Sequence, residues 1–323
     1  MFLIRRILRV ATVLSATLLV AGTGCSRAPE RTLRVGLLVW PGFEPAYLAR
    51  QLGYLDTTQV QLVDYAGSEM RRAMRNGLLD AVGLTLTSAI QQYAAYTSLR
   101  AVMVLDISNG GDAILGGRGV RSIRDLKGRR VAVSPSGGSA YLVMRALESV
   151  GLHRADVQHV KTDETSLERA LREGRVAAVM TYEPLRSQLI DSGATQLFST
   201  ADIPGEVSDV LLTRSATVRD RPEALRAFAV AWYRAREDMR AYPDSMARLI
   251  APRERVKAAQ FRMMAQGLDW PDRQSGLQML QDTASALFDG GRRSERLLVE
   301  LGLIPTGVQG TRMIDARVTA SLP

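Results

Sequence analysis

The sequence predicts an α/β protein of two lobes, in which each lobe is a mostly parallel sheet flanked by helices. Short apolar runs rich in β-branched residues alternate with helical stretches, and repeated strand–helix–strand units of this length are typical of parallel sheets. The alternation starts at residue 33 and starts again at residue 125. The chain has 323 residues, which is more than one simple core usually holds and favours two lobes.

The first set of elements fills the stretch before residue 120. Apolar runs predict strands at 33–40, 60–66, 81–85 and 99–106. Helices separate them: the first is closed by Gly53, the second covers 68–80, and the third contains "SAIQQYAAY". A further strand at 112–119 is expected to leave the first lobe.

The second set begins at 125–152, where "DLKGRRVAVSPSGGSAYLVMRALESVGL" predicts a strand, a Gly/Ser turn and a helix. Three further stretches predict a strand edge, a helix and a strand with a turn: "VQHVKTDE", "SLERALREGRV" and "AAVMTYEP". A last strand is expected at 208–214, and everything after it looks helical. There Asp220 can cap a helix that Pro222 opens.

The first 25 residues predict a lipoprotein signal peptide. A basic head precedes an apolar core from Val10 to Val20, and small residues then lead to Cys25, the only cysteine. The apolar run is short for a membrane span. We expect Cys25 to be acylated, which places the protein in the periplasm or cell envelope, held at the membrane by its lipid anchor alone. Gly22 departs from the aliphatic residue usual in a lipobox, so ordinary secretion and an uncleaved anchor remain alternatives.

The charge pattern argues against nucleic acid as a partner. Residues 1–25 hold three arginines and no acidic residue, so their removal lowers the net charge from +9 to +6. The basic residues are scattered among acidic ones, as in "RAREDMR", which is typical of a solvated surface. No cysteine follows Cys25, so disulfides are not expected to stabilise the fold.

The order of the segments resembles the periplasmic substrate-binding proteins of ABC importers, in the nitrate/sulfonate/taurine and thiamine-precursor group. The resemblance runs in order over nearly the whole chain after Cys25. It is carried by "WPGFEPAYLARQLGYL", "GLLDAVGLTLTSAI", "DLKGRRVAVSPSGGSAYLVMRALESVGL", "VMTYEP", "SDVLLTR" and "LGLIPTGVQGTRMIDARV".

The resemblance implies a type II periplasmic-binding fold, in which two lobes joined by two crossing segments close on a ligand. On that pattern the first lobe is 32–116 with 209–323, and the second is 117–208. It also implies a monomer that binds a small molecule and delivers it to ABC permease and ATPase subunits, with no cofactor and no metal.

Four turns between a strand and a helix make up the candidate binding site. In open α/β sheets, ligands bind beyond the carboxyl ends of the strands, at helix N-termini. Aromatic side chains offer flat apolar faces there, while hydroxyls and free backbone N–H groups offer directional polarity. The candidate ligand-binding residues are Trp40, Phe43, Glu44, Thr85, Thr87, Ser136, Gly137, Gly138, Ser139, Tyr182, Glu183 and Asp209.

Each turn also has an interpretation that needs no ligand. The aromatics of "WPGFEP" can belong to a core, and Glu44 can complement the positive end of its helix. The glycines of "SPSGGSA" can serve a tight turn and a cap, although two glycines flanked by three serines also suit an oxyanion. Ser88 is expected to cap a helix and Glu183 to start one. Asp209 can be a hinge residue or a partner for a donor, and both remain open.

The sequence does not favour an enzyme. The only histidines, His153 and His159, lie far from every glycine turn, and no catalytic triad, HExxH, Walker A loop or Rossmann fingerprint occurs. Fungal pyrimidine-precursor synthases share the expected fold, but they depend on a histidine and a cysteine-rich motif that have no match here. A sensor lipoprotein that docks on a membrane signalling protein remains the alternative to transport.

The ligand class follows from opposing charge arguments. Helix N-termini favour an anion, whereas Glu44 and Glu183, with no Lys or Arg inside the four turns, argue against nitrate. Aromatic walls favour a planar, pyrimidine-like molecule. A zwitterionic aminosulfonate suits both charge arguments, with its sulfonate at Ser136 to Ser139 and its amine at Glu44. Sulfonate-like and pyrimidine-like ligands are therefore expected ahead of nitrate.

Overall fold

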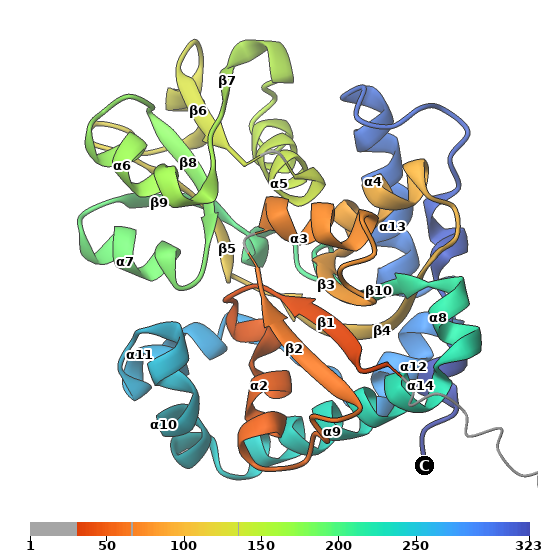
Figure 1. Ribbon diagram of the computed structural model, residues 1–323. Helices are drawn as coiled ribbons and strands as arrows, with labels where there is room; N and C mark the ends of the chain where they lie inside the picture. Colours follow the sequence, from red (N-terminus) through yellow and green to blue (C-terminus); the bar gives the residue numbers. More distant parts are fainter. Residues whose placement is uncertain (1–30, 66, 135) are drawn as a thin grey trace, which may run out of the picture. The chain divides into compact units, whose positions relative to one another are not determined.

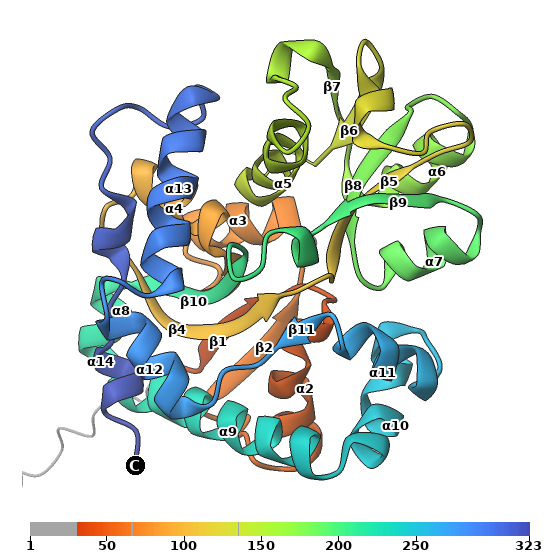
Figure 2. The same ribbon diagram turned by 180° about the vertical axis from the view of Figure 1, so that it is seen from behind.

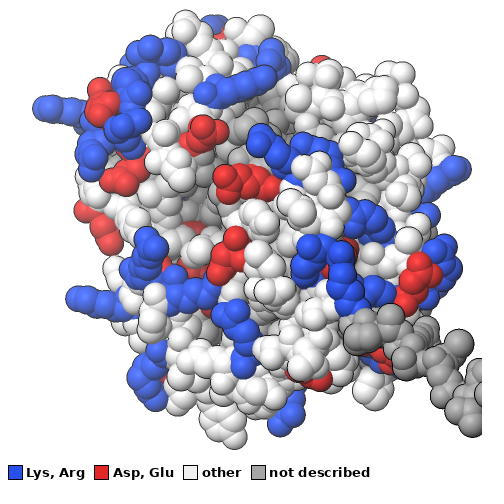
Figure 3. All heavy atoms as spheres, in the orientation of Figure 1, with Lys and Arg blue, Asp and Glu red and all other residues white. Residues whose placement is uncertain are grey.

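The computed structural model describes residues 31–323 except Ala66 and Pro135 (Figure 1). The predicted signal peptide and Cys25 lie outside the described residues. None of the helices within these described stretches is both long and apolar enough to cross a membrane. On the face shown in Figure 3, basic and acidic side chains are interspersed.

The strands form two sheets, as the sequence predicts. The six-stranded sheet contains β1 (Leu33–Leu37), β2 (Val60–Asp64), β3 (Ala81–Thr85), β4 (Leu99–Ser108), β10 (Ser208–Arg214) and β11 (Leu268–Asp269). The five-stranded sheet contains β5 (Asp112–Gly116), β6 (Arg130–Val133), β7 (Gln158–Lys161), β8 (Ala178–Tyr182) and β9 (Thr195–Ser199). We call the parts built on these sheets the first and the second lobe.

Helices cover both faces of each sheet (Figures 1 and 2). Those of the first lobe are α2 (Glu44–Gln51), α3 (Gly67–Arg75), α4 (Leu86–Ala95), α8 (Ser215–Asp220), α9 (Pro222–Ala241), α10 (Pro243–Glu254), α11 (Ala258–Ala265), α12 (Arg273–Gln281), α13 (Ala286–Glu300) and α14 (Arg317–Ala320). Those of the second lobe are α5 (Gly137–Glu148), α6 (Leu167–Arg172) and α7 (Leu185–Asp191). Short 3-10 turns lie at Pro41–Phe43, Ile123–Leu126, Arg154–Asp156, Glu164–Ser166, Thr200–Asp202 and Gly310–Met313.

Most strands within each sheet run in the same direction. In the order β11-β4-β10-β3-β1-β2, strand β1 is parallel to β2 and β3, while β10 is antiparallel to both β3 and β4. In the order β7-β6-β8-β5-β9, strand β6 is parallel to β7 and β8, while β5 is antiparallel to β8 and β9. The carboxyl ends of β1 and β3 therefore share one edge, and those of β6 and β8 share another.

The chain changes sheets earlier than the sequence analysis placed the boundary. The stretch 112–116 was assigned to the first lobe, but β5 pairs with β8 and β9 in the second sheet. The first crossing therefore lies between Ser108 and Asp112, and the second lies between Ser199 and Ser208. The error has a physical origin, because an apolar run predicts a strand but does not say which sheet supplies its partner.

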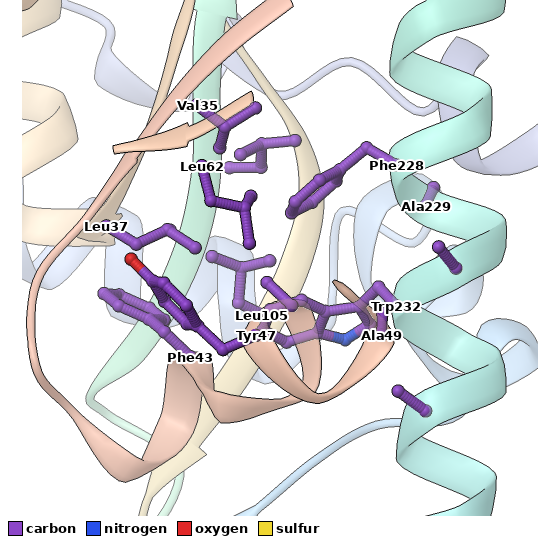
Figure 4. Packing of buried hydrophobic residues seen from close by; sticks show 14 of the residues in the cluster. Val35, Leu37, Phe43, Tyr47, Ala49, Leu62, Leu105, Phe228, Ala229 and Trp232 are labelled. Carbon is purple, nitrogen blue, oxygen red and sulfur yellow. The ribbon is translucent and has the colours of Figure 1, made fainter. Parts of the chain in front are cut away.

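The core of the first lobe is packed between its sheet and helices α2 and α9 (Figure 4). Val35, Leu62 and Leu105 point from the sheet toward Phe228 and Trp232 of α9. A second cluster on the other face of the sheet involves α3, α4 and α13. In the second lobe, α5 covers one face of the sheet, while α6 and α7 cover the other.

The sequence analysis expected the segment after β10 to be helical throughout. The structure differs. The two-residue strand β11 pairs with the end of β4. Trp270 follows it outside any helix and donates its indole N–H to the Gly42 carbonyl at 3.0 Å. This turn of the chain therefore packs against "WPGF", a contact that joins residues 228 positions apart.

Trp232 provides a test of the packing of the first lobe. Its side chain is 0% exposed and its ring centroid lies 6.0 Å from that of Phe228. We expect Trp232→Ala to lower the free energy of unfolding by about 3–5 kcal/mol, because an aromatic truncation leaves a cavity. Urea unfolding measures this loss. Val230→Ala, on the exposed side of α9, should change it by less than about 0.5 kcal/mol, and equal losses in the two variants would contradict the assignment.

Candidate functional site

A cavity of about 80 Å³ lies between the two lobes, at the carboxyl ends of β1, β3, β6 and β8. This is the edge of the sheets at which ligands of open α/β proteins bind. All four predicted turns contribute to its wall. Nine of the twelve predicted residues line the cavity: Trp40, Phe43, Thr85, Thr87, Ser136, Gly138, Ser139, Tyr182 and Asp209.

Trp40 joins the two lobes at one side of the cavity. It has an extended backbone before Pro41, which fixes the start of the 3-10 turn. Its ring meets Tyr182 of the second lobe edge-on, with centroids 5.8 Å apart and planes at 88°. Its indole N–H points between the two carboxylate oxygens of Asp106, each 3.3 Å away. Trp40 is only 3% exposed, so it belongs to the core and to the cavity wall at once.

Three serines form a hydroxyl cluster at the start of α5. Ser134, Ser136 and Ser139 lie within hydrogen-bonding distance of one another, the shortest pair being Ser134 Oγ and Ser139 Oγ at 2.6 Å. Ser136 caps α5 by accepting the Ser139 backbone N–H at 3.2 Å. Hydroxyls can rotate to donate to an incoming oxygen, and a helix N-terminus favours negative charge. This cluster therefore suits an oxyanion or a polar head group.

The two lobes touch where α4 and α5 begin. The Gly138 N–H of the second lobe points at Ser88 Oγ of the first lobe at 3.3 Å. A Cβ on Gly138 would lie 2.8 Å from Thr85 Oγ1, and one on Gly137 would lie 3.1 Å from the Thr87 carbonyl oxygen. Both glycines thus permit close approach of the lobes, although Gly137 is outside the cavity wall.

The residue that caps α4 is Thr85, not Ser88 as expected from the sequence. Thr85, expected as a ligand contact, caps α4 by accepting the Ser88 backbone N–H at 3.2 Å. Ser88, expected as the cap, lines the cavity and accepts from the second lobe. Thr85 lines the cavity as well, whereas the Thr87 hydroxyl is held by Ser294 of α13 at 2.7 Å.

Glu44 does not line the cavity, and the predicted amine contact at this residue is not supported. Its side chain is 1% exposed and accepts a hydrogen bond from Arg253 of α10, which also binds Asp64 at 2.6 Å. Burial raises the pKa of the Glu44 carboxyl, and Arg253 opposes this shift. The carboxylate turns toward Arg253 because a buried charge requires a partner.

Glu183 also lies outside the cavity wall and serves the helix that follows it. Its carboxylate is 1% exposed and accepts from Arg186 at 2.7 Å and from the backbone and hydroxyl of Ser187 at 3.0 and 2.8 Å. All three donors are on or next to the first turn of α7. This is the role as a helix start that the sequence analysis considered for Glu183.

Three aspartates, here called the acidic cluster, meet beside Trp40. Asp106 is on β4, Asp112 begins β5, and Asp209 lies on β10 opposite both Asp106 and Thr85. Their exposed fractions are 0%, 8% and 7%. Asp112 and Asp209 line the cavity, and Asp106 lies behind them. In the described stretches no group of three His, Cys, Asp or Glu side chains is arranged to hold a metal ion.

Burial shifts the titration of the acidic cluster upward. It raises the pKa of Asp112 to about 6, and it holds the pKa values of Asp106 and Asp209 well above their usual range. Charge repulsion between the carboxyls adds to these shifts, while hydrogen bonds from Trp40 and Ser108 oppose them. The carboxyls of Asp106 and Asp209 are hydrogen-bonded to each other, which raises the pKa of Asp209 and lowers that of Asp106.

Several residues of the cavity wall were not predicted from the sequence. Ser134 follows the carboxyl end of β6, the position that drew attention to the other turns, whereas Asp112 is the first residue of β5. Arg71 of α3 is the one basic side chain among the described residues of the wall. Tyr141 also lines the cavity and donates its hydroxyl to Glu206 at 2.6 Å.

Comparison with known families gives the relationship of this chain. Its sequence matches the family described as NMT1/THI5 like over residues 40–246, roughly two thirds of the chain. The chain belongs to the NMT1/THI5 like family. The matched stretch contains all four turns and the acidic cluster, so the cavity of this NMT1/THI5 like protein lies within the family region.

Two kinds of relatives accompany this match. Proteins of Brucella abortus (strain 2308) and Brucella suis biovar 1 (strain 1330), named only as binding proteins, are each 24% identical over 159 residues, or 48% of this chain and 50% of theirs. The chain thus spans about half the length of the curated relatives it matches. Among solved structures, the alkanesulfonate-binding protein SsuA from Xanthomonas axonopodis pv. citri bound to MOPS has a TM-score of 0.75 at 18% identity, covering 90% of this chain and 99% of that one.

Other solved structures give the same fold. The periplasmic aliphatic sulphonate binding protein SsuA from Escherichia coli has a TM-score of 0.72 at 20% identity, with 90% and 99% of the two chains covered. The desulfurization enzyme DSZB has a TM-score of 0.65 at 16% identity, with 89% and 98% covered. These likenesses confirm the predicted two-lobed periplasmic-binding fold for this NMT1/THI5 like protein.

Gly138→Val tests whether the start of α5 belongs to a binding site. A side chain at residue 138 would collide with Thr85 and hold the lobes apart. We expect at least tenfold weaker ligand binding by isothermal titration, with an unchanged thermal midpoint. Ala140→Val, two residues further along α5 and outside the cavity wall, is the control and should bind normally. Normal affinity in Gly138→Val would remove this turn from the site.

Proposed function

We propose that this protein is an extracytoplasmic solute-binding protein, which captures a small organic solute between its lobes and delivers it to an ABC importer. The cavity carries the proposal, because it combines an aromatic wall with hydroxyls and the start of a helix from each lobe. The family and the names of its relatives agree with a binding role.

The cavity favours a small ligand with one polar end. One water-sized atom needs about 10–15 Å³, so a cavity of about 80 Å³ suits on the order of five to eight non-hydrogen atoms unless the lobes open further. The hydroxyl cluster suits a sulfonate, and the two solved relatives named above are named for binding sulfonates. A pyrimidine-like ligand suits the Trp40 and Tyr182 rings. Nitrate ranks behind both, because a bare anion would leave the apolar and aromatic part of the wall, including Trp40, without a contact.

Catalysis is the rival suggested by the likeness to the desulfurization enzyme. Here the cavity offers neither a thiol nor an imidazole, because the only cysteine precedes Ser26 and neither His153 nor His159 lines the wall. Its hydroxyls bond to one another, and no hydroxyl of the wall is hydrogen-bonded to a histidine among the described residues. These features support binding over a reaction and set this protein apart from the fungal synthases as well.

A thermal-shift screen of the protein truncated before Ser26 tests the proposed function. The panel contains taurine, propanesulfonate, an aminopyrimidine and nitrate. A true ligand at a hundredfold excess over its Kd should stabilise the folded state by about 2.7 kcal/mol. Turnover of a stabilising compound, followed by mass spectrometry, would favour the enzyme instead. A genome neighbourhood with a kinase or cyclase, in place of a permease and an ATPase, would favour the sensor.

Cys25 is proposed as the lipid attachment residue. We expect the full-length protein expressed in a Gram-negative host to partition with membranes, and Cys25→Ser to release it to the soluble periplasmic fraction with altered electrophoretic mobility. Ser26→Ala is the control, since it leaves the acceptor thiol in place. Unchanged membrane partitioning and mobility of Cys25→Ser would contradict the lipid anchor and favour an uncleaved one, whereas a soluble wild type would favour ordinary secretion.

A further inference from the structure

Glu206 lies in the second crossing segment, between β9 and β10, and its side chain contacts both lobes. Its carboxylate accepts two hydrogen bonds from Arg145 of α5, at 2.8 and 3.0 Å, and one from the Tyr141 hydroxyl of the same helix at 2.6 Å. Arg293 of α13, on the first lobe, forms an ion pair with the same carboxylate at 3.2 Å. One side chain is therefore held by a helix of each lobe.

These contacts lie where α5 of the second lobe meets α13 of the first (Figures 1 and 2). Leu297, one turn after Arg293 on α13, packs into a hydrophobic cluster of the second lobe. A Cβ on Gly290 of α13 would lie 3.2 Å from the Glu206 carbonyl oxygen, so this helix also packs closely against the crossing segment. A movement that separates α5 from α13 must therefore break a contact of Glu206.

The surroundings of Glu206 keep its carboxylate ionised. Burial opposes ionisation, but hydrogen bonds from Arg145 and Tyr141 and the charge of Arg293 lower the pKa of Glu206 below its ordinary value. Arg145 has a second partner, Glu148 at 2.6 Å. Arg293 forms no other ion pair within the described residues. The arginine of the first lobe thus depends on Glu206 alone for its ion pair.

The two arginines hold Glu206 with unequal strength. The side chains of Arg145 and Glu206 are 19% and 17% exposed, and their contact is bidentate, which is the strong form of this interaction. The Arg293 side chain is 45% exposed, so solvent screens its ion pair. The contact with Arg293 is therefore the weaker one, and it should break first when the lobes separate.

We propose that Arg145, Glu206 and Arg293 form an ionic clasp, which holds the two lobes together beside the cavity and opens at Arg293. The contact with Arg145 stays intact during opening and keeps the carboxylate in position for Arg293 to return. All three are positioning residues, because none of them lines the cavity. One consequence rests on the proposed solute-binding function: the clasp slows the departure of a bound solute, since release requires the lobes to separate.

The neighbouring residue on α13 provides a matched control. Arg292 forms an ion pair with Asp289 of the same helix at 2.6 Å and donates to the Thr283 carbonyl at 3.0 Å. Both partners belong to the first lobe, so this ion pair cannot resist separation of the lobes. Arg292→Gln removes the same charge from the same helix as Arg293→Gln and should leave the distance between the lobes unchanged.

Spin-label distances in the ligand-free protein test the clasp. No cysteine follows Cys25, so the protein truncated before Ser26 can carry one introduced cysteine on each lobe. This protein retains the whole compact unit Thr32–Pro323. Thr97→Cys, after α4, and Ala155→Cys, between α5 and β7, place the labels at exposed positions. Double electron–electron resonance then gives the populations of shorter and longer distances between the lobes.

We expect Arg293→Gln to raise the ratio of longer to shorter distances about two- to fivefold, the range of a solvent-screened ion pair. Glu206→Gln should raise it by the same factor, because both variants remove one contact. The double variant should go no further than either single variant. Arg293→Lys, which keeps the charge, should retain the wild-type distances.

Two results would overturn the clasp. One is an unchanged distance distribution in Arg293→Gln, and the other is a double variant whose effect is the product of the two single effects. Thermal midpoints show whether each variant is folded. If Glu206→Gln does not fold, the comparison of Arg293→Gln with Arg292→Gln decides alone, because both of these arginines lie on the partly exposed side of α13.

Solute release separates the clasp from the proposed function. Stopped-flow dissociation of propanesulfonate and taurine should be about two- to fivefold faster from Arg293→Gln than from the wild type or from Arg292→Gln. Equal rates would overturn the role of the clasp in release and leave solute binding standing. If no compound of the wider panel binds, the proposed function fails, and the distances in the ligand-free protein still decide whether the clasp exists.

Discussion

The need to neutralise buried carboxyls governs the arrangement of this protein. Charge buried away from water is costly unless it is paired. Glu44, Asp80 and Glu183 each form an ion pair with an arginine. These pairs fix the positions of α2, β1 and α7 relative to their neighbours. Within the described residues, the acidic cluster and Glu254 form no ion pair, and of these two only the acidic cluster lies at the cavity between the lobes. The same constraint that fixes the scaffold thus leaves costly buried carboxyls at the cavity.

Local pattern predicted the elements better than it predicted their partners. The strands at 81–85 and 208–214 were placed to the residue, because apolar runs bounded by polar turns identify strands. Strand β9, "TQLFS", has a weaker pattern with exposed residues at its start and was not predicted. The assignment of 112–116 failed because sheet membership depends on partners more than 60 residues away in sequence.

The same limit applies to the site. Nine of the twelve candidates, which were chosen from turns at predicted strand ends, lie on the cavity wall. This agreement follows from topology, because parallel strands bring their carboxyl ends to the same edge of a sheet. The side chains that faced elsewhere did so for long-range reasons. Glu44 meets an arginine 209 residues away, and Thr87, although it lines the wall, has its hydroxyl held by a serine 207 residues away. No local pattern in "WPGFEP" or "TSA" contains that information.

The contacts between the lobes also constrain what a ligand must supply. The serines of the hydroxyl cluster bond to one another, and the Gly138 N–H points at Ser88. A ligand oxyanion has to replace these bonds, so its net gain is modest, as for most exchanges of one hydrogen bond for another. Asp209 Oδ1 has no donor within the described residues, but the Asp209 carboxyl is hydrogen-bonded to that of Asp106, so a ligand here also exchanges one bond for another. The polar groups of the cavity wall should therefore set the orientation of a ligand more than its affinity.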